Sequence, residues 1–222
     1  MKRNLAAMFF VAVLSTGAQA QFGLPSLGGG SSNSNSGDIG AQVETFNKDA
    51  NLFAQAMRAS LVQINGAIGS DTQRAAAKAQ MENITKGTNT QEEQARAGTY
   101  AKDSISETTA LFASAEAKQR MDNLTPEIQK LVVDAYVQAI IAGTKIPAAV
   151  NSGKKILEGI GSNPMNISKA IPVKDGLSLY ADMLPKIPPL LSAMAQFFKD
   201  RKVTPPNPAA DAPQNVITPK LP

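Results

Sequence analysis

The amino-acid sequence predicts an all-α protein, a helical bundle of about four to six helices, in residues 38–202. Apolar residues recur at three- and four-residue spacings over most of this range, and capping signals divide it into segments of helical length. No stretch of useful length shows the apolar–polar alternation of a half-buried strand. With 222 residues, 43% of them hydrophobic, the chain is large and apolar enough to form one domain with a core.

The first predicted helix extends from Asp38, its capping residue, to Ile68. An apolar residue recurs at every seventh position, in a row that consists of Val43, Ala50, Met57 and Ile64. This helix either packs inside its own chain or forms a coiled-coil seam between two copies through residues 39–68, which would make a homo-oligomer. Few charged pairs flank the row, and this favours packing inside the chain.

The next two helices are predicted from capping boxes, in which a Ser or Thr and a Gln or Glu three residues later cap each other's backbone N–H groups. Ser70 and Gln73 open a short, alanine-rich helix. Thr90 and Glu93 open a longer helix that is expected to end at about Met121.

The most apolar helix is predicted between Thr125 and Ala142. Thr125 can cap its free N–H groups, Pro126 suits the first helical position, and Gly143 can end it in a left-handed conformation. Its apolar residues cover roughly 240° of the circumference, whereas a surface helix carries a stripe of about 100°. We therefore expect this helix at the centre of the bundle. Its narrow polar edge, where we expect contact with solvent, consists of Glu127, Lys130, Asp134 and Gln138.

Glycines and prolines divide the sequence that follows into shorter pieces. Residues 145–161 include Pro147 and are expected to form one broken helix or two short ones. Residues 162–174 are predicted to be a loop. Two further helices are predicted at 175–184 and 190–202.

Both ends of the chain have compositions that do not form a packed core. Residues 1–20 combine a basic start, an apolar stretch and a small-residue cleavage site, so they are predicted to be a signal peptide that is removed after Ala20. Residues 21–37 are predicted to be a flexible Gly/Ser/Asn linker. Residues 203–222 contain six prolines and are predicted to be a disordered tail. The expected location of the protein is periplasmic or secreted.

The composition argues against several classes of function. Without Lys2 and Arg3 the chain has 20 basic and 18 acidic residues, and a net charge of +2 does not indicate nucleic-acid binding. Histidine and cysteine are absent, which removes His/Cys zinc sites, Ser-His-Asp triads and histidine general bases. Ser152 and Lys155 have the spacing of a serine acyl-enzyme, but the companion motifs of that class are missing. We therefore expect a protein that is not an enzyme, with no catalytic residue, cofactor or metal.

The predicted last helix provides the candidate partner-binding residues. Basic side chains end this helix, and its bulky apolar face consists of Leu190, Leu191, Met194, Phe197 and Phe198. An apolar stripe at this spacing is more often part of a core than a docking face. The same features also describe a helix that lies on a membrane surface.

From these observations we expect a binding or scaffolding protein of the bacterial envelope, which holds a protein partner or an apolar molecule on its helical faces. The alternative is a membrane-active protein whose segments 140–160 and 190–202 leave the bundle for lipid. Lys145, Lys154 and Lys155 oppose this alternative, because each charge at mid-bilayer costs roughly 2.5–3.5 kcal/mol.

Overall fold

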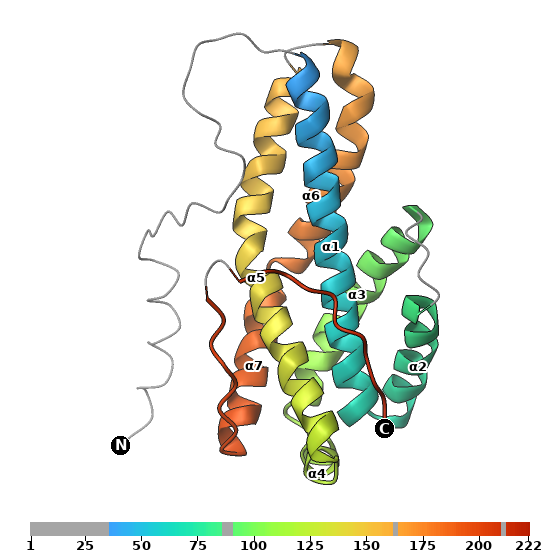
Figure 1. Cartoon of the computed structure of the whole chain (residues 1–222), viewed down its shortest axis with the longest axis vertical. Coiled ribbons are helices and arrows are strands. Elements are labelled where there is room, and N and C mark those ends of the chain that lie inside the picture. The colour runs from blue at the N-terminus through green and yellow to red at the C-terminus, as the bar shows by residue number, and fades with distance from the viewer. Residues whose placement is uncertain (1–35, 86–90, 162–163, 210–211) are drawn as a thin grey trace. The chain divides into compact units, whose positions relative to one another are not determined.

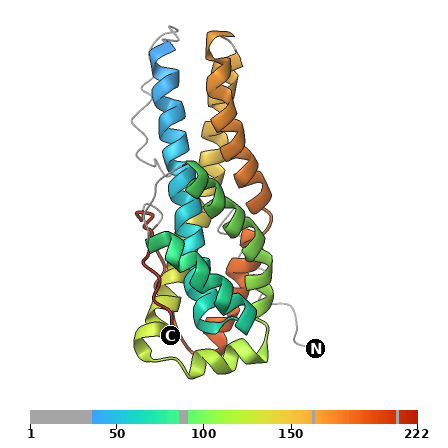
Figure 2. The same ribbon diagram turned by 90° about the vertical axis from the view of Figure 1, so that its right-hand side faces the viewer.

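The computed structural model describes residues 36–85, 91–161, 164–209 and 212–222, all within one compact unit. These residues contain no β-strand, so the all-α fold class is confirmed. Their elements, shown in Figures 1 and 2, are α1 (Ser36–Ile68), α2 (Asp71–Thr85), α3 (Gln91–Leu111), α4 (Ala115–Asp122), α5 (Pro126–Gly161), the 3-10 helix η1 (Pro164–Lys169), α6 (Ala170–Met183) and α7 (Ile187–Asp200).

The predicted signal peptide lies outside the described residues, as does the predicted linker up to residue 35. The last two linker residues, Ser36 and Gly37, belong to the first turn of α1. The described part of the chain has seven α-helices, more than the four to six predicted. One predicted helix divides into α3 and α4, whereas the predicted segments 125–142 and 145–161 form the single helix α5.

Helix α1 is the centre of the bundle. It contacts α2, α3, α4, α5, α6 and η1, and every residue from 56 to 69 is buried. Figures 1 and 2 show α2 and α3 on one side of α1 and α5 on another. The sequence predicts the centre at residues 125–142, but α5 contacts mainly α1, α6, α7 and η1 and so has fewer neighbours than α1. Glu127 and Lys130 form its exposed edge, as predicted. In the structure α1 packs within its own chain, as its charge pattern favours.

Helix α5 begins where the sequence predicts but extends much further. Thr125 caps it, since its Oγ1 accepts the Ile128 N–H at 3.4 Å. Gly143 does not end it, and Pro147 lies inside a single helix that continues to Gly161. A Cβ atom on Gly143 would lie 2.9 Å from Cγ2 of Ile187, so this glycine permits the close approach of α7.

The helix predicted from residue 90 to 121 is divided. Helix α3 ends at Leu111, and α4 begins at Ala115 after a turn. Ser114 caps α4, because its Oγ accepts the Ala117 N–H at 3.0 Å. The break places Phe112 in the core, where its ring packs 5.1 Å from that of Phe197.

The capping box that opens α2 is confirmed. The Ser70 N–H donates to Gln73 Oε1 at 2.8 Å, and the Gln73 N–H donates to Ser70 Oγ at 3.3 Å. Of the second predicted box, Thr90 and the side chain of Glu93 lie outside the described residues.

The loop predicted at 162–174 contains η1 and the first turn of α6. Asp175 therefore lies inside α6 and does not cap it. Helix α7 begins at Ile187, three residues earlier than predicted, because Pro188 and Pro189 fit its first turn. A proline in the first turn lacks only an N–H that has no helical partner at that position.

The C-terminal segment is the largest departure from the prediction. Its described residues, 203–209 and 212–222, are not helical, and the segment crosses α5 and descends along α1 (Figure 1). Val203 and Ile217 pack against the core. These residues make apolar contacts and hydrogen bonds within the chain, whereas their composition alone predicts disorder.

Candidate functional site

The predicted partner-binding face of α7 is part of the core. Four of its residues are at most 1% exposed, and Leu191 is half-buried; the four are Leu190, Met194, Phe197 and Phe198. Rings of α7 pack against Phe112, in the turn after α3, and Tyr136 of α5 at centroid distances of 5.1 and 5.2 Å. These side chains pack inside the folded bundle, and a role of this face in partner binding stays a prediction.

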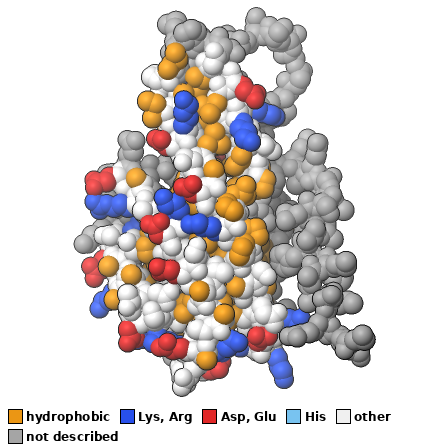
Figure 3. Space-filling model, turned by 180° about the vertical axis from the view of Figure 1, so that it is seen from behind, with side chains coloured by type: hydrophobic (Ala, Val, Ile, Leu, Met, Phe, Trp, Pro, Cys, Tyr) orange, Lys and Arg blue, Asp and Glu red, His pale blue; other side chains and the backbone are white. Residues whose placement is uncertain are grey.

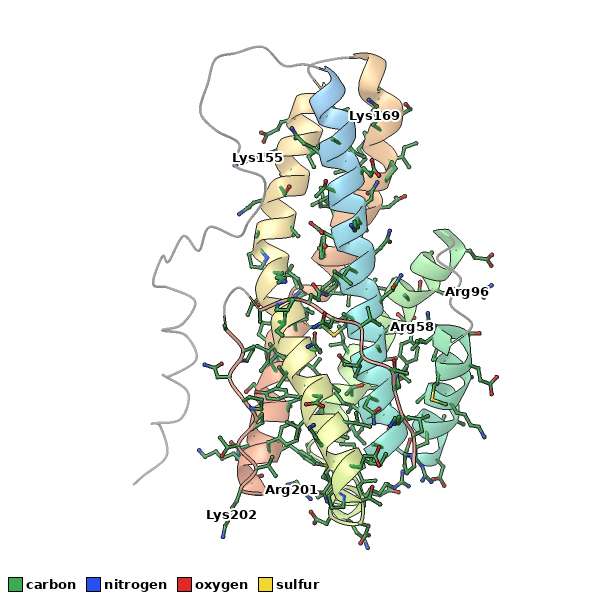
Figure 4. All side chains as sticks on the ribbon, viewed as in Figure 1. Arg58, Arg96, Lys155, Lys169, Arg201 and Lys202 are labelled. Atoms are coloured by element: carbon green, nitrogen blue, oxygen red, sulfur yellow. The ribbon has the colours of Figure 1, made fainter. Side chains whose placement is uncertain are left out.

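The basic end of α7 is partly used inside the molecule. Arg201 Nε donates to Asp122 Oδ1 of α4 at 3.1 Å, and its Nη2 donates to the Lys118 carbonyl. The guanidinium also lies over the Phe197 ring, 4.3 Å from its centroid. Lys202 follows it at the exposed end of the helix (Figure 4). Arg201 therefore joins α7 to α4 and is not available to a lipid headgroup.

The C-terminal segment covers one side of α1 and α5 and makes hydrogen bonds there. We call this surface the tail groove and define it by Gln63 and Gly66 of α1 and Glu127 and Gln138 of α5. Its occupant, residues 212–222, is called the tail.

Gln63 makes the central contact of the tail groove. Its Nε2 donates to the Lys220 carbonyl at 3.0 Å, and the Lys220 N–H donates to its Oε1 at 2.7 Å. One side-chain amide thus pairs with both main-chain groups of one residue. Gln63 is 0% exposed, so both hydrogen bonds are shielded from water and neither polar group of the amide is left unpaired.

Two further polar contacts and one close apolar contact hold the tail. The Asn215 N–H donates to Gln138 Oε1 at 2.9 Å. The Lys220 ammonium lies 3.1 Å from Glu127 Oε1, with both side chains largely exposed, so this ion pair contributes little energy. Leu221 lies directly against Gly66, because a Cβ on that glycine would be 2.1 Å from Leu221 Cδ2.

The tail groove holds an extended segment by its main chain and by the shape of a few side chains. Sequence analysis missed it, although two signals were present. Gln63 interrupts an otherwise apolar run from Leu61 to Ile64, and Gln138 lies on the polar edge of a strongly apolar helix. We expected Gln138 to contact solvent, whereas it is half-buried under the tail.

A second polar cluster lies between α1 and α3. The Thr108 hydroxyl donates to Asn65 Oδ1 at 2.9 Å, and the Tyr100 hydroxyl is hydrogen-bonded to Asn65 and Ser104. Burial raises the pKa of Tyr100, and these hydrogen bonds oppose that rise. On the neighbouring side Arg58 donates to a carbonyl of α2 at 3.4 Å (Figure 4). The charge of Glu107 also contributes to the raised pKa of Tyr100. We interpret this cluster as a cross-link between helices.

Acidic groups do not gather elsewhere in the described ranges. Among these residues no group of three or more His, Cys, Asp or Glu side chains is placed to hold a metal ion. Partial desolvation raises the pKa of the Asp49 carboxyl group of α1, while the charges of Lys145 and Lys48 lower it.

The largest exposed apolar side chains lie where η1 meets α6. Ile167 and Ile171 are 63% and 64% exposed and stand four residues apart. Lys169 and Lys174 are their neighbours in sequence. Figure 3 shows hydrophobic and basic side chains side by side on the upper part of the face opposite to that of Figure 1. We call Ile167, Ile171, Lys169 and Lys174 the apolar–basic tip.

Helix α5 has the length and composition of a membrane span, with 39% of its most apolar window buried in the protein. This is weak evidence for a membrane, because the core helix of a bundle meets the same criteria.

No protein-family model matches the sequence, and neither the curated proteins nor the solved structures contain a match.

Proposed function

We propose that the protein is an exported, non-enzymatic protein of the bacterial envelope that binds or scaffolds a protein partner or an apolar molecule through its helical faces. One observation supports this most: the faces of α1 and α5 already hold an extended polypeptide, the tail, through Gln63, Gln138 and Gly66. A helical surface with this property is suited to a peptide segment of another protein.

Export is proposed from the signal-like residues 1–20. Cells that express the full chain are separated into cytoplasmic, periplasmic and secreted fractions, and the N-terminus of the purified protein is sequenced. We expect a chain that begins at Gln21 in the periplasmic or secreted fraction. Protein in the cytoplasm that still carries residues 1–20 would contradict export.

Partner binding is tested by site-specific crosslinking in the envelope. A photoreactive residue replaces Lys130, which is exposed on α5 three residues from Glu127. The matched control replaces Lys155, exposed on the same helix (Figure 4). We expect a specific crosslinked protein from position 130 and none from position 155. If neither position captures a specific protein, the proposal is contradicted.

Contact with a lipid surface is the second candidate function, and the apolar–basic tip favours it. Large apolar side chains beside lysines suit the boundary of an anionic bilayer. The segments first considered for this role give less support, since the apolar face of α7 is buried and α5 packs against α1, α6 and α7.

Flotation with vesicles that contain anionic lipid separates the two candidates. The wild-type chain is compared with the double variant Ile167→Asp and Ile171→Asp, which replaces two exposed side chains. Lipid contact would be the preferred function if the wild-type chain floats with the vesicles, the double variant does not, and crosslinking captures no protein.

A further inference from the structure

Resting on the proposed function, we infer that the tail groove is a regulated peptide-recognition site. The tail occupies it within the same chain, and the partner it fits is an extended protein segment with the order proline, basic residue, leucine, as in Pro219-Lys220-Leu221. Such a segment competes with the tail for the groove.

The main chain of the bound segment is recognised by Gln63. Its amide forms a donor and an acceptor hydrogen bond with one residue, Lys220, at 3.0 and 2.7 Å. Neighbouring strands of a sheet pair in the same way, and such main-chain bonds supply affinity without selecting a sequence. Gln63 is buried while the tail is in place, so an occupant that replaces the tail must supply both a donor and an acceptor to this amide.

The sequence order is recognised by three neighbouring contacts. Pro219 is buried, and a proline holds its own backbone and that of the preceding residue in extended conformations. Lys220 extends its ammonium toward Glu127 at 3.1 Å. Leu221 lies on Gly66 so closely that any larger residue at that position of α1 would overlap with it.

Occupation within the chain lowers the affinity for a partner. The tail is joined to α7 by residues 203–211, which include Pro205, Pro206 and Pro208, and a tethered segment acts at an effective concentration in the millimolar range. A separate segment with the same recognition residues must displace the tail before it can bind. Weakening the tail should therefore strengthen the binding of a separate peptide.

The experiment uses the full chain, which contains no cysteine. Thr218, an exposed tail residue, is replaced by cysteine and labelled with an environment-sensitive dye. Gly66→Ala in α1 should displace the Leu221 side chain, weaken the hold on the tail and shift the dye emission toward that of a free labelled peptide, while favouring the helix itself. The matched control is Gly161→Ala in α5, because a Cβ at Gly161 meets nothing within 4 Å. This control should leave the emission unchanged.

A second measurement tests recognition of a separate segment. A labelled peptide of residues 212–222 is titrated with the wild-type chain and with the full-length variant Ile217→Asp plus Leu221→Asp, whose tail contacts are weakened. Fluorescence anisotropy should show at least tenfold tighter binding to the variant, and circular dichroism should show that its helices are retained. A peptide with Pro219, Lys220 and Leu221 in scrambled order should not bind. If the variant does not fold, excess unlabelled peptide must displace the dye-labelled tail of the wild-type chain.

Three results would overturn the inference. The first is a folded variant that does not bind the peptide. The second is a Gly66→Ala chain whose dye emission matches that of the Gly161→Ala control. The third is a dimer of the full chain that Gly66→Ala abolishes, since a second copy would then be the occupant. Peptide binding without a crosslinked envelope protein would contradict only the proposed function, and a crosslinked protein without peptide binding would contradict only this inference.

Discussion

Buried polar side chains of α1 determine which elements can surround it. Gln63 pairs with the tail, Asn65 with Thr108 of α3, and Arg58 with a carbonyl of α2. A buried polar group that loses its partner costs about 1–3 kcal/mol, whereas a satisfied one costs little. Each pair therefore fixes the rotation and the axial position of the neighbouring segment relative to α1, which apolar contacts alone do not specify.

The Asn65–Thr108 hydrogen bond provides a first prediction. Thr108→Val keeps the shape of the side chain but removes the donor to buried Asn65, so we expect a loss of about 1–3 kcal/mol in the free energy of unfolding. Urea denaturation measures it. The matched control is Thr109→Val, because Thr109 donates at 2.7 Å to Ile105 within its own helix and is only half-buried. Equal losses in both variants would contradict a special role of the interhelical bond.

Tyr180 provides a prediction about pH. Its ring packs 5.1 Å from that of Phe53, and burial together with the charge of Asp49 raises the pKa of its hydroxyl group. The unfolded chain loses this proton near pH 10 while the folded chain retains it. The contribution of Tyr180 to stability is therefore complete below about pH 10 and declines above it.

The corresponding variant is Tyr180→Phe, which removes this titration but keeps the aromatic contacts. Thermal unfolding is measured between about pH 8 and 11.5 by circular dichroism. We expect the midpoint of the variant to decrease less steeply above about pH 10 than that of the wild-type chain. Parallel curves for the two proteins would refute the assignment.

At the scale of elements, small residues in α5 and α6 mark contacts between helices. A Cβ on Gly153 would lie 2.8 Å from side chains of Leu177 and Phe46, and one on Gly176 would lie 2.7 Å from Phe46. These glycines let α1, α5 and α6 approach closely. Gly66 and Gly143 have the same kind of role toward the tail and α7, so four glycines inside helices are explained by neighbours and not by helix ends.

Pro147 provides a prediction at the element scale. It is exposed in the middle of α5 and cannot donate to the carbonyl of Gly143 one turn earlier. Pro147→Ala should restore this hydrogen bond and raise the free energy of unfolding by up to about 3 kcal/mol. The control Asn151→Ala, also exposed on α5, changes helix propensity alone and should gain less than about 0.7 kcal/mol. A thermal midpoint for Pro147→Ala at or below that of the control would contradict this expectation.

At the scale of the whole molecule, two aromatic clusters join helices that are distant in sequence. Phe46 and Phe53 of α1 pack against Tyr180 of α6, with ring centroids 6.1 and 5.1 Å apart. Phe112, Tyr136, Phe197 and Phe198 join α3, α5 and α7. Because α7 supplies two rings of the second cluster, the bundle depends on a helix whose composition also suggested a docking surface.

Phe198→Asp separates the structural role of α7 from a binding role. Phe198 is 0% exposed; removing a buried aromatic ring costs about 3–5 kcal/mol, and burying a carboxylate adds to that cost. The total approaches the free energy of unfolding of a typical domain, about 5–15 kcal/mol. We therefore expect circular dichroism to show an unfolded or aggregated protein. Ile171→Asp, at a 64% exposed position, should keep the helical spectrum. A folded Phe198→Asp protein that loses only partner binding would support the docking interpretation.

The sequence by itself determined the features that depend on neighbours in the chain. The capping box of Ser70 and Gln73 and the start of α5 at Pro126 were predictable, because each uses hydrogen bonds or backbone restrictions within four residues. The all-α class was predictable for the same reason, since helical periodicity is a local property. The periodic face of α7 was predicted correctly as a face, although periodicity does not distinguish a core contact from a docking contact.

Only the tertiary structure decided the features that depend on distant contacts. The continuation of α5 through Gly143 and Pro147 rests on packing against α1 and α7, and such packing outweighs the local preference of a glycine or a proline to end a helix. The tail is held by Gln63, which lies 157 residues before Lys220 in the sequence. The sequence shows Gln63 only as a polar residue within an apolar run and does not show its partner, because the energy of this pair arises only when folding brings the two segments together.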